Sequence, residues 1–196
     1  MARLEMDHLC DAFAAPVPTP AGGSAAAAVA AIAASLVMMV GRGSPDWGEG
    51  NEAESAAAVL RERLLVLGGE DVDAVEAMLA AFRLRAQPGA GGGADVVGAV
   101  LRAAEVPLEI ARCAAGVAAL ARDAAENGKR PMRADAEAAA TLAASAAQVA
   151  ASIVDVNLRG LPAGWADEES AAFREAARIA LVSADRGSSD SEVACT

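Results

Sequence analysis

Aromatic and imidazole side chains are scarce in this sequence. It has no tyrosine, and aromatic residues make up only 3% of its 196 positions. His8 is its single histidine. Because one histidine supplies one imidazole, a Ser-His-Asp triad, a Cys-His pair and a multi-histidine metal centre are all disfavoured. We therefore expect no metal site, and a core built mainly from alanine and small aliphatic residues that allow helices to pack closely.

Basic residues are also few. Lysine and arginine together number 16 against 27 acidic residues, which gives a formal net charge of −11 and an isoelectric point near 4.5. So acidic a chain repels phosphate backbones and anionic lipids. We expect no nucleic-acid partner and no membrane partner, and an anionic ligand would require arginines placed locally around it.

Cysteine usage and the first residues indicate the compartment. The three cysteines, Cys10, Cys113 and Cys195, are odd in number and share no CxxC spacing, which favours reduced thiols. The opening MARLEMDHLC carries acids where an export signal carries lysine or arginine. These features predict a cytoplasmic protein.

One long stretch, residues 12–41, contains no charge at all. Three prolines and a glycine pair interrupt its first half, so the expected helix is 24–40, too short to span a membrane comfortably. Alanine is moreover a weak driver of insertion. A helix without a polar face is typical of a buried or interface helix, and we expect it at or beside the interface of a homodimer.

The hydrophobic periodicity predicts an all-α protein, a single-domain helical bundle over residues 1–185 with no strand. The tail 186–196 has the composition of a disordered segment. The expected helices are 3–15, 24–41, 51–67, 70–85, 94–127, 133–158 and 168–185.

The segment PTPAGGS, residues 18–24, precedes the uncharged helix and is the first candidate for a binding site. Gly22 and Gly23 lack side chains and permit positive φ, while Ser24 is a residue type that caps helices. The free amides of the first helical turn then face an anionic or carbonyl-bearing ligand. Pro20, Gly22, Gly23 and Ser24 are the candidate ligand contacts, and the alternative is an ordinary turn capped by Ser24.

Asp71 is the best candidate for a general acid or base. It heads an apolar stripe that continues at four- and three-residue spacing through Val75, Met78 and Phe82. Burial along that stripe raises the pKa of a carboxyl group and allows it to exchange a proton nearer neutral pH. Asp73 points elsewhere and is expected in water. The alternative places Asp71 in the first turn of a helix that starts after a glycine pair, where acids are favourable anyway.

Three further side chains are candidate ligand contacts. Asp135 heads a second apolar stripe, formed by Leu142, Val149 and Val156. Asn157 lies near the end of a helix that looks buried, where an unpaired amide costs roughly 1–3 kcal/mol, so it requires a partner from the protein or a ligand. Arg83 ends the Asp71 helix and is suited to binding a carboxylate.

Four segments in order resemble the cyclodeaminase/cyclohydrolase family. PTPAGGS is similar to the family's proline-threonine-proline, triple-glycine, serine signature, and the other matches are DVDAVEAMLAAFRL, VPLEIA and pieces of residues 128–158. The resemblance covers roughly residues 4–158. This family includes the C-terminal domain of formiminotransferase-cyclodeaminase and stand-alone methenyltetrahydrofolate cyclohydrolases.

The resemblance implies an enzyme of folate one-carbon chemistry. The expected substrate is 5-formimino- or 5,10-methenyltetrahydrofolate, with tetrahydrofolate as the carrier of the carbon and no further cofactor. Asp71 falls on the aspartate proposed as the family's proton donor, and Asp135 on the aspartate of its Ser-Asp-Ala piece, although Ala134 replaces the serine. The glutamate tail of a folate is a carboxylate that Arg83 is suited to bind.

Several positions depart from the family pattern, among them Ala21 for a glycine, Ala86 for a lysine and Ile153 for an asparagine. Two alternatives follow, because a shared fold does not fix a function. One is a diverged member that acts on another amidine-like substrate. The other is a helical interaction module without catalytic activity.

Overall fold

The computed structural model describes residues 2–87, 95–162 and 167–185, which include six α-helices, one short 3-10 helix and no strand. The all-α prediction is confirmed for these residues, while the predicted tail 186–196 lies outside them. The elements are α1 (Ala2–Ala14), α2 (Gly22–Gly43), α3 (Gly50–Arg85), α4 (Val96–Asn127), η1 (Arg130–Met132), α5 (Arg133–Leu158) and α6 (Asp167–Asp185).

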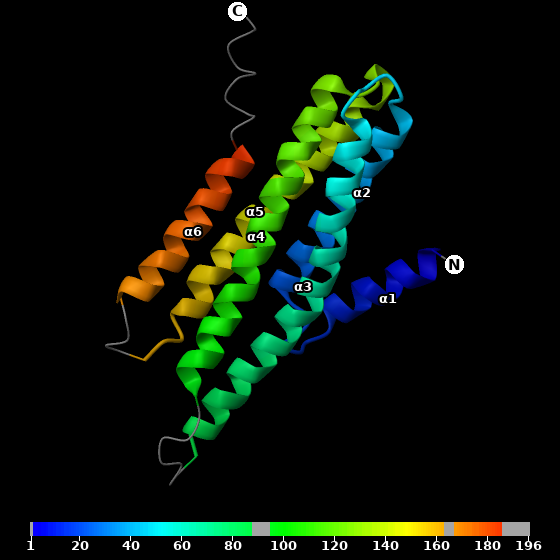
Figure 1. The fold of residues 1–196 in the computed structure, drawn as a ribbon. Helices are drawn as coiled ribbons and strands as arrows, with labels where there is room; N and C mark the ends of the chain where they lie inside the picture. The colour runs from blue at the N-terminus through cyan, green and yellow to red at the C-terminus, as the bar shows by residue number, and fades with distance from the viewer. Residues whose placement is uncertain (1, 88–94, 163–166, 186–196) are drawn as a thin grey trace, which may run out of the picture.

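Helices α2, α3, α4 and α5 form a four-helix bundle (Figure 1). Each of the four packs against its two neighbours around the bundle, and α2 also contacts α4 across its centre. Helix α6 packs along α4 and α5 on the outside, and α1 runs at an angle beside the bundle (Figure 1).

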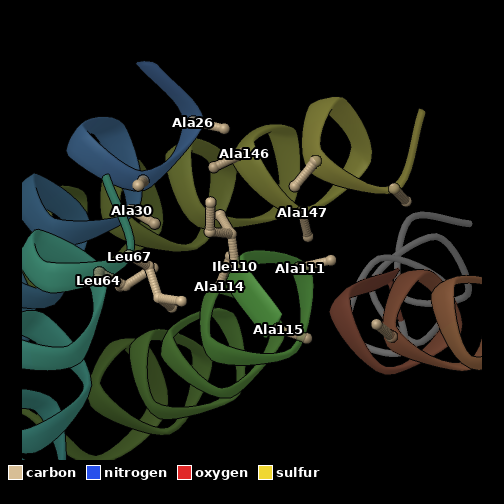
Figure 2. Packing of buried hydrophobic residues seen from close by; sticks show 14 of the residues in the cluster. Ala26, Ala30, Leu64, Leu67, Ile110, Ala111, Ala114, Ala115, Ala146 and Ala147 are labelled. Carbon is tan, nitrogen blue, oxygen red and sulfur yellow. The ribbon is translucent and has the colours of Figure 1, made fainter. Parts of the chain in front are cut away.

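The core consists mostly of alanine. Figure 2 shows Ile110 of α4 between alanines of the neighbouring helices, with Leu64 and Leu67 of α3 nearby. These three are among the largest fully buried side chains. Because alanine is short, the backbones of the helices approach closely, and a few larger residues fill the remaining space. The predicted close packing is confirmed.

Helix α3 differs from its prediction, because a single helix of 36 residues replaces two helices broken at Gly68 and Gly69. Each glycine inside a helix lowers the stability of that helix by about 1 kcal/mol relative to alanine. Burying a leucine contributes about 1.5–3 kcal/mol, and Leu64 and Leu67 just before the glycines are fully buried. Packing thus outweighs local propensity. Asp71 consequently lies inside the helix, and the interpretation of Asp71 as a first-turn acid is wrong.

Helix α2 begins two residues before its predicted start and is 22 residues long. By length and composition alone, Gly22–Gly43 and Arg130–Leu158 are each apolar enough to cross a membrane, so the prediction that the first is too short is wrong. In the bundle, 61% of the most apolar stretch of α2 is buried, as expected for a core helix.

Helices α2 and α5 run antiparallel. Gly22 at the start of α2 lies beside Ile153 near the end of α5, and Gly43 at the end of α2 lies beside Met132, just before α5. The first turn of α2 therefore lies beside both the middle of α3 and the last turns of α5. The candidate site lies where these segments meet.

Candidate active site around Asp71

The carboxylate of Asp71 lies against the first turn of α2. Asp71 is only 2% exposed, which confirms the burial predicted from its stripe, whereas Asp73 is exposed as expected. The Ser24 hydroxyl donates a hydrogen bond of 2.9 Å to Asp71 Oδ2. Since Ser24 is also buried, the pair is withdrawn from bulk water.

Gly23 makes this approach possible. A Cβ atom at Gly23 would lie 2.6 Å from Asp71 Cγ, far inside ordinary van der Waals contact. Gly22 and Gly23 are both part of the α2 helix, and neither adopts the left-handed backbone that the sequence allowed. The need for glycine at position 23 thus comes from the Asp71 carboxylate, and the positive φ that glycine permits is not used.

Ser24 does not cap the helix, so the alternative of an ordinary turn capped by Ser24 is wrong. Ala21 occupies the N-cap position with an extended backbone and makes no side-chain capping bond. Ser24 is the third residue of α2, and its hydroxyl turns toward Asp71 instead. The carboxylate therefore sits where the unpaired amides and the positive end of the helix dipole favour negative charge.

Burial raises the pKa of the Asp71 carboxyl group above its ordinary value, as predicted. Hydrogen bonds from the side chain and the backbone of Ser24 act in the opposite direction, because they favour the ionised form. The resulting group is a buried acid whose donors both belong to Ser24. Such a group is suited to giving and taking a proton at a higher pH than an exposed aspartate.

The segment before α2 is tied to α3. Thr19 Oγ1 donates to Glu76 Oε1 at 2.8 Å, five residues beyond Asp71 on the same helix. The next residue, Pro20, is half-buried. Thr19 and Glu76 are 57 positions apart, and no local pattern in the sequence signals their pairing.

Ile153 lies at one edge of the site. A Cβ atom at Gly22 would lie 3.2 Å from Ile153 Cδ1, so this half-buried side chain packs on the start of α2. Position 153 is the one where an asparagine was expected by resemblance. The site consequently has an apolar edge there instead of an amide.

Asn157 is buried, as predicted, and its partner belongs to the protein. Its Nδ2 donates to the backbone oxygen of Ala103 at 2.6 Å. Ala103 lies four residues before Pro107, which has no N–H to complete the helical hydrogen bond inside α4. The amide of Asn157 therefore satisfies a carbonyl that the proline leaves free.

Arg83 and Asp135 are not brought to Asp71. Both are exposed. At 1.5 Å per residue, Arg83 lies about 18 Å along α3 from Asp71, and Asp135 about 27 Å along α5 from Ile153. The stripe headed by Asp135 is also exposed instead of buried. Ligand contacts of these two residues stay predictions.

The cavity of about 590 Å³ between α4, α5 and α6 is a separate feature. Its lining includes Arg122, Arg133 and Gln148, and neither Asp71 nor Ser24 nor Asn157 belongs to it. Within the described ranges, no three histidine, cysteine or acidic side chains are grouped as a metal site. Asp71 itself offers a buried carboxyl group, a type of group that transfers protons.

Comparison with known proteins identifies the family. The family model described as formiminotransferase-cyclodeaminase matches residues 5–178. A methenyltetrahydrofolate cyclohydrolase of Methylorubrum extorquens is 32% identical over 167 residues, 80% of each chain. The crystal structure of formiminotetrahydrofolate cyclodeaminase from Thermotoga maritima has a TM-score of 0.74 at 24% identity, covering 91% of this chain and 92% of that one, and shows the same fold. With nearly its whole helical part matched, this chain belongs to the formiminotransferase-cyclodeaminase family.

Proposed function

We propose that this protein is a folate one-carbon enzyme, a methenyltetrahydrofolate cyclohydrolase or a formiminotetrahydrofolate cyclodeaminase, with Asp71 as its general acid and base. The observation that carries the proposal is the buried Asp71 carboxyl group, held by Ser24 at the start of α2. The 32% identical relative that is named a cyclohydrolase supports the same class of chemistry.

Both reactions pass through a tetrahedral carbon. In the cyclohydrolase reaction, water adds to the methenyl carbon and the ring opens to the 10-formyl compound. In the cyclodeaminase reaction, N10 attacks the formimino carbon and ammonia leaves. Each reaction removes a proton from the attacking atom and delivers one to the leaving nitrogen, and a single carboxyl group can do both. In the cyclohydrolase reaction the hydroxyl on the tetrahedral carbon also releases its proton to water as the formyl C=O forms.

The decisive experiment compares two substitutions. Asp71→Asn keeps the size of the side chain and its acceptor for Ser24 but cannot cycle a proton, so we expect most turnover of the active folate to be lost. Asp73→Asn, two residues away and exposed, serves as the matched control and should retain it. Turnover is measured with 5,10-methenyl- and 5-formiminotetrahydrofolate. Equal losses in both variants, or none in either, contradict the assignment.

Thermal unfolding with added folates separates the enzyme from a non-catalytic module. A ligand that binds only the folded state raises the unfolding temperature. We expect stabilisation by at least one of the two substrates or their products. A well-folded protein whose unfolding temperature responds to none of them favours the interaction module or a changed substrate.

We also propose a homodimer, formed through the outer faces of α2 and α5. These adjacent helices expose apolar side chains: Ile32 and Met39 on α2, and Leu142, Val149 and Val156 on α5. Ile32→Glu should shift the molar mass measured by light scattering from two chains to one. Val59→Glu, on the outside of α3, is the control and should not. A monomeric parent protein overturns the proposal.

We also propose that the protein is cytoplasmic and binds neither nucleic acids nor membranes. The net charge of −11 favours a protein with neither nucleic-acid nor membrane partners, and the cysteine pattern favours the cytoplasm. Fractionation of cells that express the protein tests both points, since a membrane-bound or nucleic-acid-bound pool contradicts them.

A further inference from the structure

The hydrogen bond between Ser24 and Asp71 distinguishes the two oxygens of the carboxyl group. Ser24 Oγ donates to Oδ2 at 2.9 Å, and both residues are buried. Gly23, whose missing Cβ leaves room for the carboxylate, keeps this arrangement close to the backbone of α2. Oδ2 therefore has a fixed hydroxyl donor, and the backbone of Ser24 also donates to the carboxyl group.

We propose that Ser24 is a positioning residue for Asp71: its hydroxyl holds Oδ2 as an acceptor, so that Oδ1 is the oxygen that carries and transfers the proton. This inference rests on the proposed function. It also replaces the sequence-based expectation that Ser24 contacts the substrate.

The chemistry follows from the hydrogen-bonding capacity of a carboxylic acid. A neutral carboxyl group carries its proton on one oxygen and accepts on the other. When the Oδ1–H bond breaks, the proton passes to the leaving nitrogen and its electron pair stays on the carboxylate. The hydroxyl and the backbone of Ser24 then stabilise the ionised form. The next proton, taken from the attacking water or N10, returns to Oδ1.

None of the charged groups described near Asp71 is shown as a partner of its carboxylate, so Ser24 is its described partner. Helix α2 carries no charged residue before Arg42, in its last turn. On α3, the neighbouring Glu70 pairs with Arg63 and with Arg102 of α4, and Glu76 accepts from Thr19. Asp73 is exposed.

The last turns of α5 lie beside Gly22, one residue before the glycine that faces Asp71. Asp155 is exposed there and pairs with Arg174 of α6. Burial raises the pKa of Asp71 and the hydrogen bonds from Ser24 act against it, and no ion pair to Asp71 is found among the described residues.

The experiment removes the hydroxyl at two positions of the same helix. Ser24→Ala deletes the donor to Asp71, while the control Ser35→Ala deletes a hydroxyl that bonds only to Ala31 O of its own helix. Losing a donor to the carboxylate raises the pKa of Asp71 further, so the limb of the pH–rate profile that depends on Asp71 should move to higher pH in Ser24→Ala alone. We expect kcat to fall about ten- to a hundredfold with KM unchanged. Ser24→Thr keeps a hydroxyl and should restore the profile.

A second measurement is independent of turnover. The ¹³C carboxyl resonance of Asp71, assigned with Asp71→Asn, should titrate at higher pH in Ser24→Ala than in the parent and in Ser35→Ala. An unchanged titration in Ser24→Ala overturns the proposal whatever the activity. If the parent protein turns over neither folate, the proposed function fails, and the resonance still decides whether Ser24 sets the protonation of Asp71.

Discussion

Gly23→Ala is the most informative substitution, because it adds one methyl group at the point where α2 meets Asp71. The new Cβ would lie 2.6 Å from Asp71 Cγ and still closer to Oδ1, whereas ordinary contact begins at 3.4 Å, so the carboxylate has to withdraw by at least about 0.8 Å. The bond from Ser24 is 2.9 Å long. Withdrawal along that bond takes it beyond the roughly 3.5 Å at which a hydrogen bond is effectively lost.

The expected cost combines two opposing effects. Overpacking at a buried position costs about 1–3 kcal/mol, and alanine recovers up to about 1 kcal/mol of helix propensity relative to glycine. We expect a net loss of about 1–2 kcal/mol. For a chain of this size, each kcal/mol corresponds to about 2–4 °C in the unfolding temperature.

Gly22→Ala is the matched control, one residue earlier in the same turn. Its Cβ would lie 3.2 Å from Ile153 Cδ1, the end of a flexible side chain that can turn away. Thermal unfolding by circular dichroism and turnover of the active folate are measured for both variants. Gly23→Ala should lose stability and most activity, and Gly22→Ala little of either. Equal stability and equal activity in the two variants would refute the argument that Gly23 exists to admit Asp71.

Three further predictions concern stability. The raised pKa of Asp71 means that the folded state binds a proton more tightly than the unfolded state, so this group's contribution is largest below pH 3.8 and is lost as pH rises through the folded pKa. Asp71→Asn should therefore be more stable than the parent at pH 7, with the gap closing in acid, by chemical denaturation at several pH values; a gap independent of pH contradicts this. Asn157→Ala leaves the Ala103 carbonyl without its donor and should cost about 1–3 kcal/mol in the same assay, and a neutral effect means that water replaces the amide. Leu64→Ala opens a cavity in the centre of the bundle and should cost about 2.7–5 kcal/mol, while a cost below 1 kcal/mol indicates that the alanine-rich core collapses around it.

The sequence predicted those parts of the site that depend on local periodicity. The stripe through Val75 and Met78 placed Asp71 on the buried face of its helix, and the apolar surroundings of Asn157 indicated that its amide needs a partner. Helix α5 also has its predicted bounds. In each case the information lies within a few turns of one helix.

Local periodicity in the sequence could not predict the contacts between distant segments. Ser24 and Asp71 are 47 positions apart, and the capping preference of serine indicated a local bond that the structure does not contain. The two glycines before Asp71 likewise indicated a helix end, because propensity is local whereas the burial of Leu64 and Leu67 depends on the other helices. Both errors arise where tertiary packing overrides a local preference.

The continuity of α3 through its glycines is what aims Asp71 at α2. Successive residues of an α-helix are rotated by about 100°, so a one-residue break at Gly68 would turn the Asp71 carboxylate away from Gly23. The helix is held straight by leucines buried before the glycines and by Ala74 and Met78 buried after them. The packing of the alanine-rich core therefore has two effects. It keeps α3 continuous through its two glycines, and it fixes the direction in which the buried Asp71 carboxylate points.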